Sequence, residues 1–553
     1  MRRFASAKEP TMNFDPAYVP YPSTRFPIYA REGIVAASSP QASAAGLEAL
    51  RQGGNAIDAA VAAAATLTVT EPCSNGIGSD AFAIVWTGGK LYGLNASGRA
   101  PLNISIDKIK ADYKLAGATP GKMPHFGWAP IMVPGAPKAW ARLAESFGRL
   151  PLKKSMERAI HYARDGYPLA SNLPAHFIRA ANNYKSQGGN KKVFEEWFKT
   201  FMPQSGAPKA GDMLILKNHA ASLQAIAETN ADAFYKGELA DRIVADSTEL
   251  GGYFCKEDFS SYDVDWVEPV SVNYRGYDVW EIPPNGQGVA ALAALNILNQ
   301  TDLNSRENPE TFHRQWEAMK LAFSDVLAHV TDIKFMKEDF REWLRAEYGK
   351  KRAGEINERA CMPSPVNLPK GGTVYLATAD SEGNMVSYIQ SNYMGFGSGV
   401  VVRGTGISLQ NRGADFSLNP GAANALAPGK KSYHTIIPGF LTKDGKALGP
   451  FGVMGGYMQP QGHVQVVCNM IDFGLNPQQA LDAPRWQWIE GRKILVEPGF
   501  NPEIARALAK KGHEVSVSLE TGTFGRGQII IRQDNGVLVG ATEGRTDSSI
   551  ACL

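Results

Sequence analysis

The texture of the sequence changes at Thr373, and this change limits the folds that the chain can adopt. Before Thr373, segments such as "APKAWARLAESFG", "SMERAIHYARDG" and "FHRQWEAMKLAFSDVLAHV" repeat apolar residues every three or four positions, which predicts mainly helices between residues 130 and 330. After it, "TVYLATAD", "MVSYIQSN", "HTIIPGFLT", "GQIIIRQ" and "VLVGATEG" have the composition of strands, and "DSEGN" and "QDNG" predict hairpin turns. The chain is therefore expected to be helix-rich first and strand-rich last.

The boundary is a polar, loop-like segment, "RAGEINERACMPSPVNLPKGG", which ends in Gly371 and Gly372. Its prolines and glycines predict no regular element. Taken alone, Gly-Gly-Thr is a flexible hinge before a strand, and threonine is a favoured strand residue. The same segment also gives new chain ends room to separate if the chain is cut at this point.

Two helices are predicted near the N-terminus, after a lead-in over residues 1–30 that is rich in Pro, Tyr and Arg. The first begins at Ser39 or Pro40 and stops at Gly53. The second begins at Asn55, a favourable N-cap, and its interior is mostly alanine. Without bulky side chains, the backbone of this second helix can lie close against a sheet or another helix.

Charge and composition exclude several functional classes. The formal net charge of +3 over 553 residues gives no electrostatic basis for binding nucleic acid or an acidic membrane. The most apolar run covers only residues 59–69, short of the roughly 20 residues that span a bilayer. The N-terminus lacks the apolar core of a signal peptide, and five scattered cysteines without a CxxC motif favour a reducing compartment. The protein is expected to be cytoplasmic.

Cofactor and metal sites are not indicated by the sequence. The nine histidines are scattered, and none pairs at HxxxH spacing. The glycine-rich turns "GIGSD" and "GFGSG" lack the strand–GxGxxG–helix context and the downstream acidic residue of a dinucleotide site. A nucleotide-binding enzyme is therefore the weakest alternative, and neither a cofactor nor a metal is expected.

Thr373 offers a chemistry that a strand residue does not need. A threonine hydroxyl is an effective nucleophile when a base lies beside it, and a threonine at the start of a chain supplies that base as its own α-amino group. Such a group has a pKa near ~7.7–8.0, close to working pH. It becomes available only if the Gly372–Thr373 bond is cleaved, which the hydroxyl can begin by attacking the preceding carbonyl to form an ester that water opens.

Six stretches with a characteristic order support this interpretation. They are "GGNAIDAAVAAAATLTVTEPCSNGIGSDAFAIVW", "TVYLATADSEGNMVSYIQS", "GISLQNRGADFSLNPG", "HTIIP", "MGGYMQPQGHVQVV" and "GLNPQQALDAPRW". In this order they resemble the γ-glutamyltransferase family of N-terminal-nucleophile hydrolases, from about residue 30 to residue 545. The resemblance implies an α/β fold of the four-layer αββα type, with two stacked antiparallel sheets between helical layers.

The resemblance also implies a role for each matching residue. Thr373 matches the processing site and the nucleophile, and Ser391 matches a hydroxyl that helps to place it. Gly455 and Gly456 match the backbone N–H pair of the oxyanion hole, where glycine lets the donors approach a tetrahedral oxyanion without interference from a Cβ atom. Asp415 matches the carboxylate that holds the α-amino group of the substrate. Without the resemblance, these glycines would be taken for a tight turn and Asp415 for a turn residue.

The substrate pocket departs from the family pattern. The family's arginine for the substrate α-carboxylate aligns with Ser97, and Arg99, two residues further on, is a candidate replacement. "NASGRAP", "LQNRG" and "HTIIP" resemble the branch of the family that includes oxamate amidohydrolase. At four other places this chain also differs from the usual residue of the family. A threonine is replaced by Val374, an asparagine by Tyr393, a glutamine by Arg412, and a serine pair by His434 and Thr435.

Arg412 and His434 have two interpretations. An arginine can grip a carboxylate through two parallel hydrogen bonds, and a histidine can donate one or carry charge. With Arg99, these side chains would then converge on an anionic substrate. The alternative is that both are structural, with Arg412 paired to an acid such as Asp415. The predicted substrate-binding residues are therefore Arg99, Tyr393, Arg412, Asp415, His434 and Thr435.

These observations predict a self-processing enzyme. Cleavage would give a large subunit of residues 1–372 and a small subunit of residues 373–553 that form one interleaved αββα unit and stay together as a heterodimer, with further dimerisation left open. The predicted reaction is cleavage of γ-glutamyl amides such as glutathione through a Thr373 acyl-enzyme, by hydrolysis or by transfer to an amine. One alternative is an amidohydrolase for another small anionic amide, of the oxamate or glutaryl type. The other is an uncleaved, non-catalytic member that binds an anionic metabolite or a partner.

Overall fold

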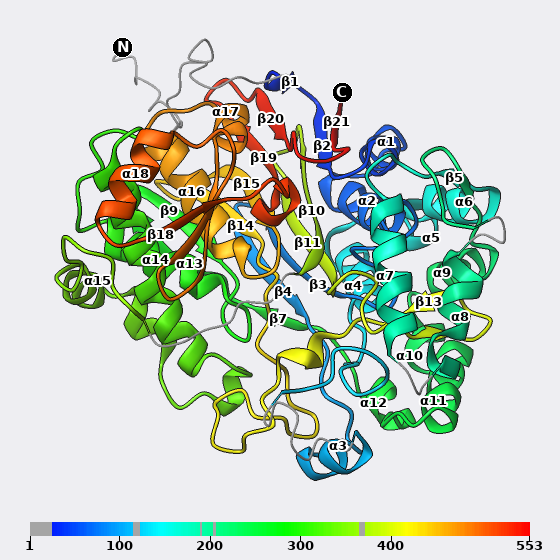
Figure 1. The fold of residues 1–553 in the computed structure, drawn as a ribbon. Helices are drawn as coiled ribbons and strands as arrows, with labels where there is room; N and C mark the ends of the chain where they lie inside the picture. The colour runs from blue at the N-terminus through cyan, green and yellow to red at the C-terminus, as the bar shows by residue number, and fades with distance from the viewer. Residues whose placement is uncertain (1–24, 114–121, 188–190, 203–205, 364–370) are drawn as a thin grey trace, which may run out of the picture.

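Two seven-stranded sheets form the centre of the fold (Figure 1). The computed structural model describes residues 25–113, 122–187, 191–202, 206–363 and 371–553. The β15 sheet has the strand order β1 (Ile28–Ala30), β20 (Leu538–Thr542), β19 (Arg526–Arg532), β15 (Lys446–Met454), β14 (Gly439–Lys443), β9 (Tyr277–Glu281) and β8 (Val270–Tyr274). The β10 sheet has the order β21 (Ser549–Cys552), β2 (Gly33–Ala37), β10 (Gly372–Asp380), β11 (Met385–Tyr393), β3 (Asp80–Thr87), β4 (Lys90–Ala96) and β7 (Asp265–Val267).

Every pair of neighbouring strands in these two sheets is antiparallel. Helices cover the outer face of each sheet. The helices that contact the β10 sheet are α1 (Pro40–Arg51), α2 (Ala56–Thr70) and α4 (Ala136–Phe147), and those that contact the β15 sheet are α13 (Gly288–Leu298), α16 (Met458–Ile471) and α17 (Pro477–Asp482). A second tier lies outside them, with α6 (Glu157–Asp165) and α9 (Lys217–Glu228) behind α2 and α14 (Pro309–His329) behind α13. The predicted four-layer αββα sandwich is confirmed.

The alternation of side chains along the strands builds three separate cores. On β10, Tyr375 and Ala377 point into the core between the two sheets, whereas Val374 and Leu376 point into the core beneath α1 and α2. On the β15 sheet, residues such as Phe451 pack instead against α13 and α16. Both faces of β10 are therefore buried, which explains why its sequence is almost continuously apolar.

Several local predictions are confirmed. The side chain of Asn55 accepts hydrogen bonds from the N–H groups of Ile57 and Asp58 and caps α2, whose residues are all buried. The "DSEGN" turn joins β10 to β11, and the "QDNG" turn joins β19 to β20. The prediction that "HTIIPGFLT" is one strand is wrong in its first half, because β14 begins at Gly439 and His434 makes only an isolated bridge with Gly286.

The remaining elements surround this framework. The helices are α3 (Ile106–Asp112), α5 (Leu152–Ser155), α7 (Pro174–Ser186), α8 (Lys191–Phe201), α10 (Asp232–Tyr235), α11 (Glu238–Glu249), α12 (Lys256–Ser260), α15 (Ala346–Ala353), α18 (Pro502–Lys510) and the short 3-10 turns η1 (Ile333–Phe335), η2 (Phe340–Leu344), η3 (Arg412–Asp415) and η4 (Thr521–Phe524). Small sheets pair β5 (Tyr167–Pro168) with β6 (Met213–Leu214), β12 (Val401–Val402) with β13 (Ile407–Ser408), and β16 (Trp486–Glu490) with β17 (Lys493–Val496) and β18 (Glu514–Val517).

Parts of two predictions lie outside the described residues, namely residues 1–24 of the lead-in and residues 364–370 of the loop before Thr373. All five cysteines fall within the described ranges, and none of them forms a disulfide. Among the residues that the structure describes, no helix combines the length and the apolarity that crossing a membrane requires.

Both sheets combine strands from the two sides of residue 373. In the β10 sheet, β10 and β11 lie between β2 and β3, which come from the first part of the chain. In the β15 sheet, the block from β20 to β14 lies between β1 and β9, which also come from the first part. The start of β10, the end of β11 and the end of β15 therefore meet within one shared core (Figure 1).

Candidate active site

Thr373 lies at the start of β10 and is buried, with a relative exposure of 1%. Its Oγ1 atom is 3.0 Å from Oγ of Ser391 on β11. The Ser391 hydroxyl also lies 2.8 Å from the carbonyl oxygen of Gly372, to which it donates, and it accepts a 2.8 Å hydrogen bond from the N–H of Tyr393. The pairing of β10 with β11 shifts register between Gly372 and Val374, so Thr373 lies at an irregularity of the ladder.

These contacts fix the direction of each hydrogen bond. A serine hydroxyl has one proton and two acceptor lone pairs. Because Ser391 gives its proton to the Gly372 carbonyl, the Thr373 hydroxyl must donate to Ser391. Ser391 therefore polarises the Gly372 carbonyl and holds the Thr373 hydroxyl at the same time. Tyr393, which follows, has φ of +74°, a region that a bulky residue enters only under constraint.

Gly455 and Gly456 form the turn between the end of β15 and the start of α16. Their φ angles are +143° and +61°, which favour glycine, and neither N–H donates a hydrogen bond to any residue that the structure describes. Gly371 packs against this turn, since a Cβ atom on Gly371 would stand 3.1 Å from the Cα of Gly456. Gln287 fixes the turn from the other side by donating to the carbonyls of Gly456 (2.9 Å) and Thr435 (2.6 Å).

Arg412 is the central charge of the adjoining pocket. It belongs to η3 and has a relative exposure of 1%. Its Nη1 donates to Oγ1 of Thr435 at 2.7 Å and lies 3.5 Å from Oδ2 of Asp415. Its guanidinium lies over the ring of Tyr393, 4.1 Å from the centroid. Its Nε and Nη2 atoms have no hydrogen-bond partner among the described residues, although Nε is 3.8 Å from a carboxylate oxygen of Asp80.

His434 does not present a free nitrogen to the pocket. Its Nδ1 accepts from the N–H of Ile436 at 3.4 Å, so its Nε2 carries the proton and donates to Oδ2 of Asp80 at 3.0 Å. Burial, with Arg412 and Lys431 nearby, holds the pKa of His434 well below its usual value, and the ring is neutral. His434 therefore positions Asp80.

Asp80 is fully buried at the start of β3. Burial raises the pKa of Asp80 to about 7, against the opposing effects of Arg412, the Gly98 N–H and Lys431. The Gly98 amide donates to Oδ1 at 3.1 Å. Near pH 7, Asp80 is thus only partly ionised, and Arg412 keeps part of its positive charge uncompensated by this neighbour.

Asp415 is already occupied within the protein. Its Oδ1 accepts hydrogen bonds from the hydroxyls of Tyr393 (2.6 Å) and Tyr457 (3.2 Å). Burial raises the pKa of Asp415, while Arg412 and the two tyrosines lower it. A substrate ammonium group would therefore have to displace internal donors from this carboxylate.

Arg99 does not take part in the buried cluster. Its side chain is 43% exposed, and its nearest acidic partner is Asp265, with Nη2 to Oδ1 at 3.9 Å. Ser97, which occupies the position of the family's arginine, is buried, and its hydroxyl donates to Oδ1 of Asn95 at 2.6 Å. Of the predicted anion-binding residues, Arg412 and His434 are thus neighbours through Asp80 and Thr435, whereas Arg99 lies at the exposed margin.

Sequence reasoning missed three residues that organise the site, namely Asp80, Gln287 and Tyr457. Asp80 had a signal, because an acidic residue directly before the apolar run "AFAIVW" is rare unless it is paired. Tyr457 directly follows the glycine pair, and its neighbourhood in sequence could have drawn attention to it. Gln287 gave no signal, because its partners lie about 150 residues away in the chain.

Comparison with known proteins adds independent evidence. A family model described as Gamma-glutamyltranspeptidase matches residues 42–553. The glutathione hydrolase-like YwrD proenzyme of Bacillus subtilis (strain 168) is 36% identical over 92% of this chain and 96% of its own length. The oxamate amidohydrolase proenzyme of Klebsiella pneumoniae is 32% identical over 94% of this chain and 98% of its own length.

A solved structure, a cephalosporin acylase from Bacillus halodurans, has 54% sequence identity with this chain and a TM-score of 0.92. The match covers 98% of this chain and 99% of the acylase. The matches cover nearly the whole length of each relative, and the relatives are named for different substrates, namely glutathione, oxamate and cephalosporin.

Proposed function

The chain belongs to the Gamma-glutamyltranspeptidase family, and on this premise we propose that it is a self-processing amidohydrolase that acts on amides of small acyl groups ending in a carboxylate. The relatives named as proenzymes support maturation by cleavage. The observation that carries the choice of acyl group is the buried Arg412, whose Nε and Nη2 make no hydrogen bond to any described residue, beside an Asp415 that is already hydrogen-bonded.

Maturation begins with Thr373 in the uncut chain. The Oγ1 atom attacks the carbonyl carbon of Gly372, the C–N bond between residues 372 and 373 breaks, and the freed amine takes up a proton. Ser391 supports this step, because it polarises the Gly372 carbonyl and holds the attacking hydroxyl. Water then opens the ester, which leaves residues 1–372 and residues 373–553 as an interleaved heterodimer and frees the α-amino group of Thr373.

Turnover uses the same hydroxyl. The α-amino group of Thr373, with an expected pKa near ~7.7–8.0, accepts the hydroxyl proton as Oγ1 attacks the substrate carbonyl. The N–H groups of Gly455 and Gly456 stabilise the oxyanion, a role that their free donors and their position beside Gly371 support. The amine leaves with a proton, and water hydrolyses the threonine ester. Transfer of the acyl group to an amine is the alternative second step.

Arg412 provides the anchor for the far end of the acyl group. Nε and Nη2 lie on one edge of the guanidinium, the arrangement that binds a carboxylate through two parallel hydrogen bonds. The raised pKa of Asp80, to about 7, weakens the competition of this carboxylate for Arg412, so that Asp415, 3.5 Å from Nη1, is the main internal competitor of a substrate carboxylate. A buried donor pair that stays unsatisfied costs about 1–3 kcal/mol per group, so a ligand that satisfies both donors gains in proportion.

The γ-glutamyl group predicted from the sequence carries an ammonium in addition to a carboxylate. Asp415, the residue assigned to that ammonium, is held by Tyr393 and Tyr457, so a glutaryl-type acyl group fits the pocket with less rearrangement. We therefore rank glutaryl-type amides first and γ-glutamyl amides such as glutathione second. For the compartment we retain the cytoplasm, which the unpaired cysteines favour.

The maturation step is tested by the masses of the fragments and the sequence of their ends. Purified protein should separate into two fragments, with the smaller beginning Thr-Val-Tyr-Leu. Thr373→Ala should remain one inactive chain, and Thr373→Ser should still be cut. A different new N-terminus, or turnover by Thr373→Ala, would overturn the assignment of the nucleophile. A single uncut chain would favour the non-catalytic alternative.

The acyl group is tested with matched anilides on the matured protein. Glutaryl, γ-glutamyl and butyryl p-nitroanilides differ only in the carboxylate and the ammonium at the far end. The glutaryl compound should have the highest kcat/KM and the butyryl compound the lowest. If kcat/KM is highest for the γ-glutamyl compound, the prediction made from the sequence is favoured. If kcat/KM is equal for all three, Arg412 does not contribute to recognition of the acyl group.

A further inference from the structure

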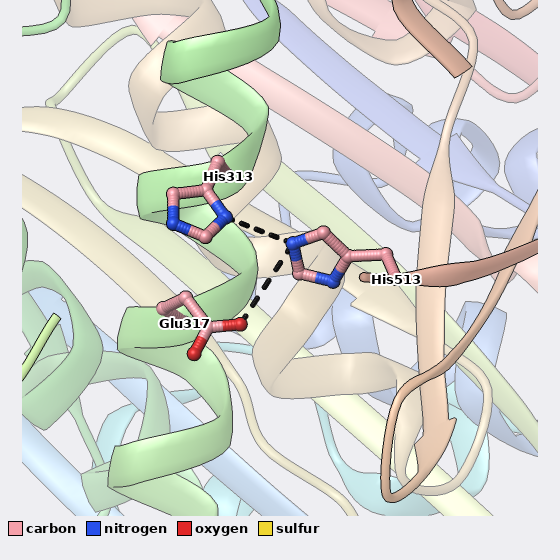
Figure 2. Close-up of side chains that lie close together, drawn as sticks. All are labelled: His313, Glu317 and His513. Carbon is pink, nitrogen blue, oxygen red and sulfur yellow. Dashed lines mark hydrogen bonds and ion pairs between the residues drawn. The ribbon is translucent and has the colours of Figure 1, made fainter. Parts of the chain in front are cut away.

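Three buried side chains that take no part in the candidate active site converge at one point (Figure 2). His313 and Glu317 project from the same face of α14, four residues apart, and His513 reaches them from the loop between α18 and β18. Their relative exposures are 0%, 1% and 3%. One ligand atom from each residue lies within 4.8 Å of the other two.

The hydrogen bonds around this trio set the tautomer of His313. Its Nε2 lies 2.7 Å from the carbonyl oxygen of Asn357 and must donate to it. In a neutral ring, Nδ1 of His313 is then a bare lone pair, and it points at Nε2 of His513 at 2.9 Å. A backbone carbonyl that fixes the outer nitrogen of a histidine is the arrangement that orients metal-binding imidazoles.

We propose that His313, Glu317 and His513 form a binding site for a divalent transition-metal ion of the zinc type. Two imidazole nitrogens and one carboxylate oxygen are a donor set that Zn²⁺ accepts, and it leaves one position open. Ligand atoms about 2.0–2.1 Å from a tetrahedral zinc ion stand roughly 3.3 Å apart. Here His513 Nε2 is 2.9 Å from His313 Nδ1 and 3.8 Å from Glu317 Oε1, and all three ligand atoms lie within 4.8 Å of one another, so the side chains must adjust toward the tetrahedral spacing to hold an ion.

The ion would replace the proton that the two rings share. That proton belongs to His513 Nε2, and it can move to Nδ1 of the same ring, which has no hydrogen-bond partner among the described residues. Glu317 keeps its orientation throughout, because its Oε2 accepts a 2.9 Å hydrogen bond from the N–H of Cys361.

Lys320 is the competitor for this site. Its ammonium lies 2.8 Å from Glu317 Oε1 and is fully buried. A metal ion must take over this oxygen, and Lys320 would then retain its contact with the carbonyl of Cys361 at 3.4 Å. Lys320 thus lowers the affinity of the site, and its removal should raise that affinity.

A surface pocket of about 850 Å³ lies next to the site. Its lining includes Asn357, Lys511 and Glu310, which flank the trio in sequence or contact it, but none of the three ligands. The ligands are buried beneath this surface, so an ion would reach them only through a local opening of the chain.

The position of the ligands suggests what the metal does. His313 and Glu317 precede residue 373, whereas His513 follows it. If the chain is cut as proposed above, the ion would join the two fragments through side chains that no peptide bond connects. This consequence rests on the proposed function, but binding of the ion does not.

Binding is tested with Co²⁺ on the untagged full chain after dialysis against EDTA, because tetrahedral Co²⁺ absorbs visibly. The wild type should bind one equivalent of Co²⁺ with intense visible bands that Zn²⁺ removes. Glu317→Gln and His513→Asn should weaken binding at least 10-fold, and Lys320→Met should strengthen it. The matched control is His161→Ala, because His161 and Asp165 have the same spacing on exposed α6, with Nδ1 to Oδ2 at 2.8 Å, and should leave the titration unchanged.

Several outcomes would overturn the proposal. They are the absence of visible bands in the wild type, unchanged affinity in both ligand variants, or a loss of binding in His161→Ala. If a ligand variant folds poorly, the change in Tm on addition of Zn²⁺ is a second measurement. Zn²⁺ should raise the Tm of the wild type and of Lys320→Met, and it should leave the Tm of Glu317→Gln unchanged. Thr373→Ala should bind Co²⁺ as the wild type does, so failure of cleavage and failure of binding are told apart.

Discussion

Arg412 and Arg485 are two arginines with the same burial and opposite uses of their donors. Each has a relative exposure of 1%. Arg485 gives Nη1 to the carbonyls of Phe524 (2.9 Å) and Gly525 (3.0 Å), and its Nη2 reaches a carboxylate oxygen of Glu543 at 2.9 Å. Arg485 leaves only Nε without a hydrogen bond among the described residues. Arg412 makes one short hydrogen bond and leaves both Nε and Nη2 without one, although Nε lies 3.8 Å from Asp80. Burial alone therefore does not distinguish a structural arginine from one proposed to bind a ligand.

The carboxylates beside the two arginines differ in the same sense. Burial raises the pKa of Glu543, but Arg485 and Arg545 outweigh it and bring the pKa to about 2. At Asp80 the effect of burial exceeds that of the neighbouring charges, and the pKa rises to about 7. The Arg485 cluster is thus a closed set of matched charges, whereas Arg412 has Asp415 at 3.5 Å and, near pH 7, a second carboxylate, Asp80, that is only partly ionised.

The largest expected effect is on folding, from Arg485→Met. Removal of one partner from a buried, hydrogen-bonded charge network typically costs about 3–5 kcal/mol. Among the described residues, Glu543 would keep only Arg545 as a cationic partner, and the carbonyls of Phe524 and Gly525 would lose their donor. Arg412→Met should cost much less, because fewer hydrogen bonds are lost. Urea unfolding of both variants measures the difference. Equal losses of stability would show that the two clusters are not distinct.

The next effect is on catalysis, from Arg412→Met. Hydrogen bonds to charged groups contribute about 1.5–3 kcal/mol, so kcat/KM for a glutaryl amide should fall about 10- to 150-fold. Activity on the butyryl amide, which has no carboxylate to bind, should stay the same. Arg412→Lys keeps the charge but not the paired donors and should give an intermediate value. A uniform fall on both substrates would assign Arg412 to the framework.

The part of the candidate site that the backbone builds could be proposed from the sequence alone. The glycine pair at 455 and 456 and the Gly372–Thr373 junction lie in short motifs whose chemistry depends on neighbours in the chain. The hairpin of β10 and β11, the cap at Asn55 and the αββα class follow from local patterns and the resemblance. These features need no knowledge of distant contacts.

The pocket could not be predicted in the same way. Its charges come from β3 and η3, and the hydrogen bond of His434, from the loop before β14, with Asp80 spans 354 positions. Sequence alone left Arg412 equally open to pairing with Asp415 and to binding a ligand; the structure shows a 3.5 Å pairing that leaves other donors free. The same limit hid the trio of His313, Glu317 and His513, because histidine spacing within one segment cannot report a partner 200 positions away.

A smaller effect is expected in the pH dependence of stability. The folded pKa of Asp80, about 7, lies above its ordinary value of 3.8, so the folded state holds this proton while the unfolded state has lost it. Between about pH 4 and 7, Asp80 therefore makes stability fall as pH rises, by at most about 1.4 kcal/mol per pH unit. Asp80→Asn should remove that fall, as measured by urea unfolding at several pH values.

Glu543 should make stability change with pH in the opposite direction. Its folded pKa of about 2 lies below its ordinary value of 4.5, so its contribution is present above pH 4.5 and is lost as pH falls toward 2. In Glu543→Gln, the free energy of unfolding should therefore fall less steeply as the pH drops below about 4.5. Its dependence on pH between about pH 5 and 7 should stay the same. The same slope change in both variants would contradict the contrast between the clusters.

The smallest expected effect concerns the choice between glutaryl and γ-glutamyl groups. Tyr393→Phe removes the 2.6 Å hydrogen bond to Asp415 but retains the ring on which Arg412 lies. The freed oxygen can accept a substrate ammonium, so the ratio of kcat/KM for γ-glutamyl to glutaryl anilide should rise about 5-fold, the equivalent of about 1 kcal/mol. Tyr388→Phe is the matched control, because this tyrosine lies on the same strand and its hydroxyl donates to Gln390, away from Asp415. If the ratio does not move in Tyr393→Phe, or moves equally in Tyr388→Phe, occupation of Asp415 is not what excludes the ammonium, and the preference must come from Arg412 alone.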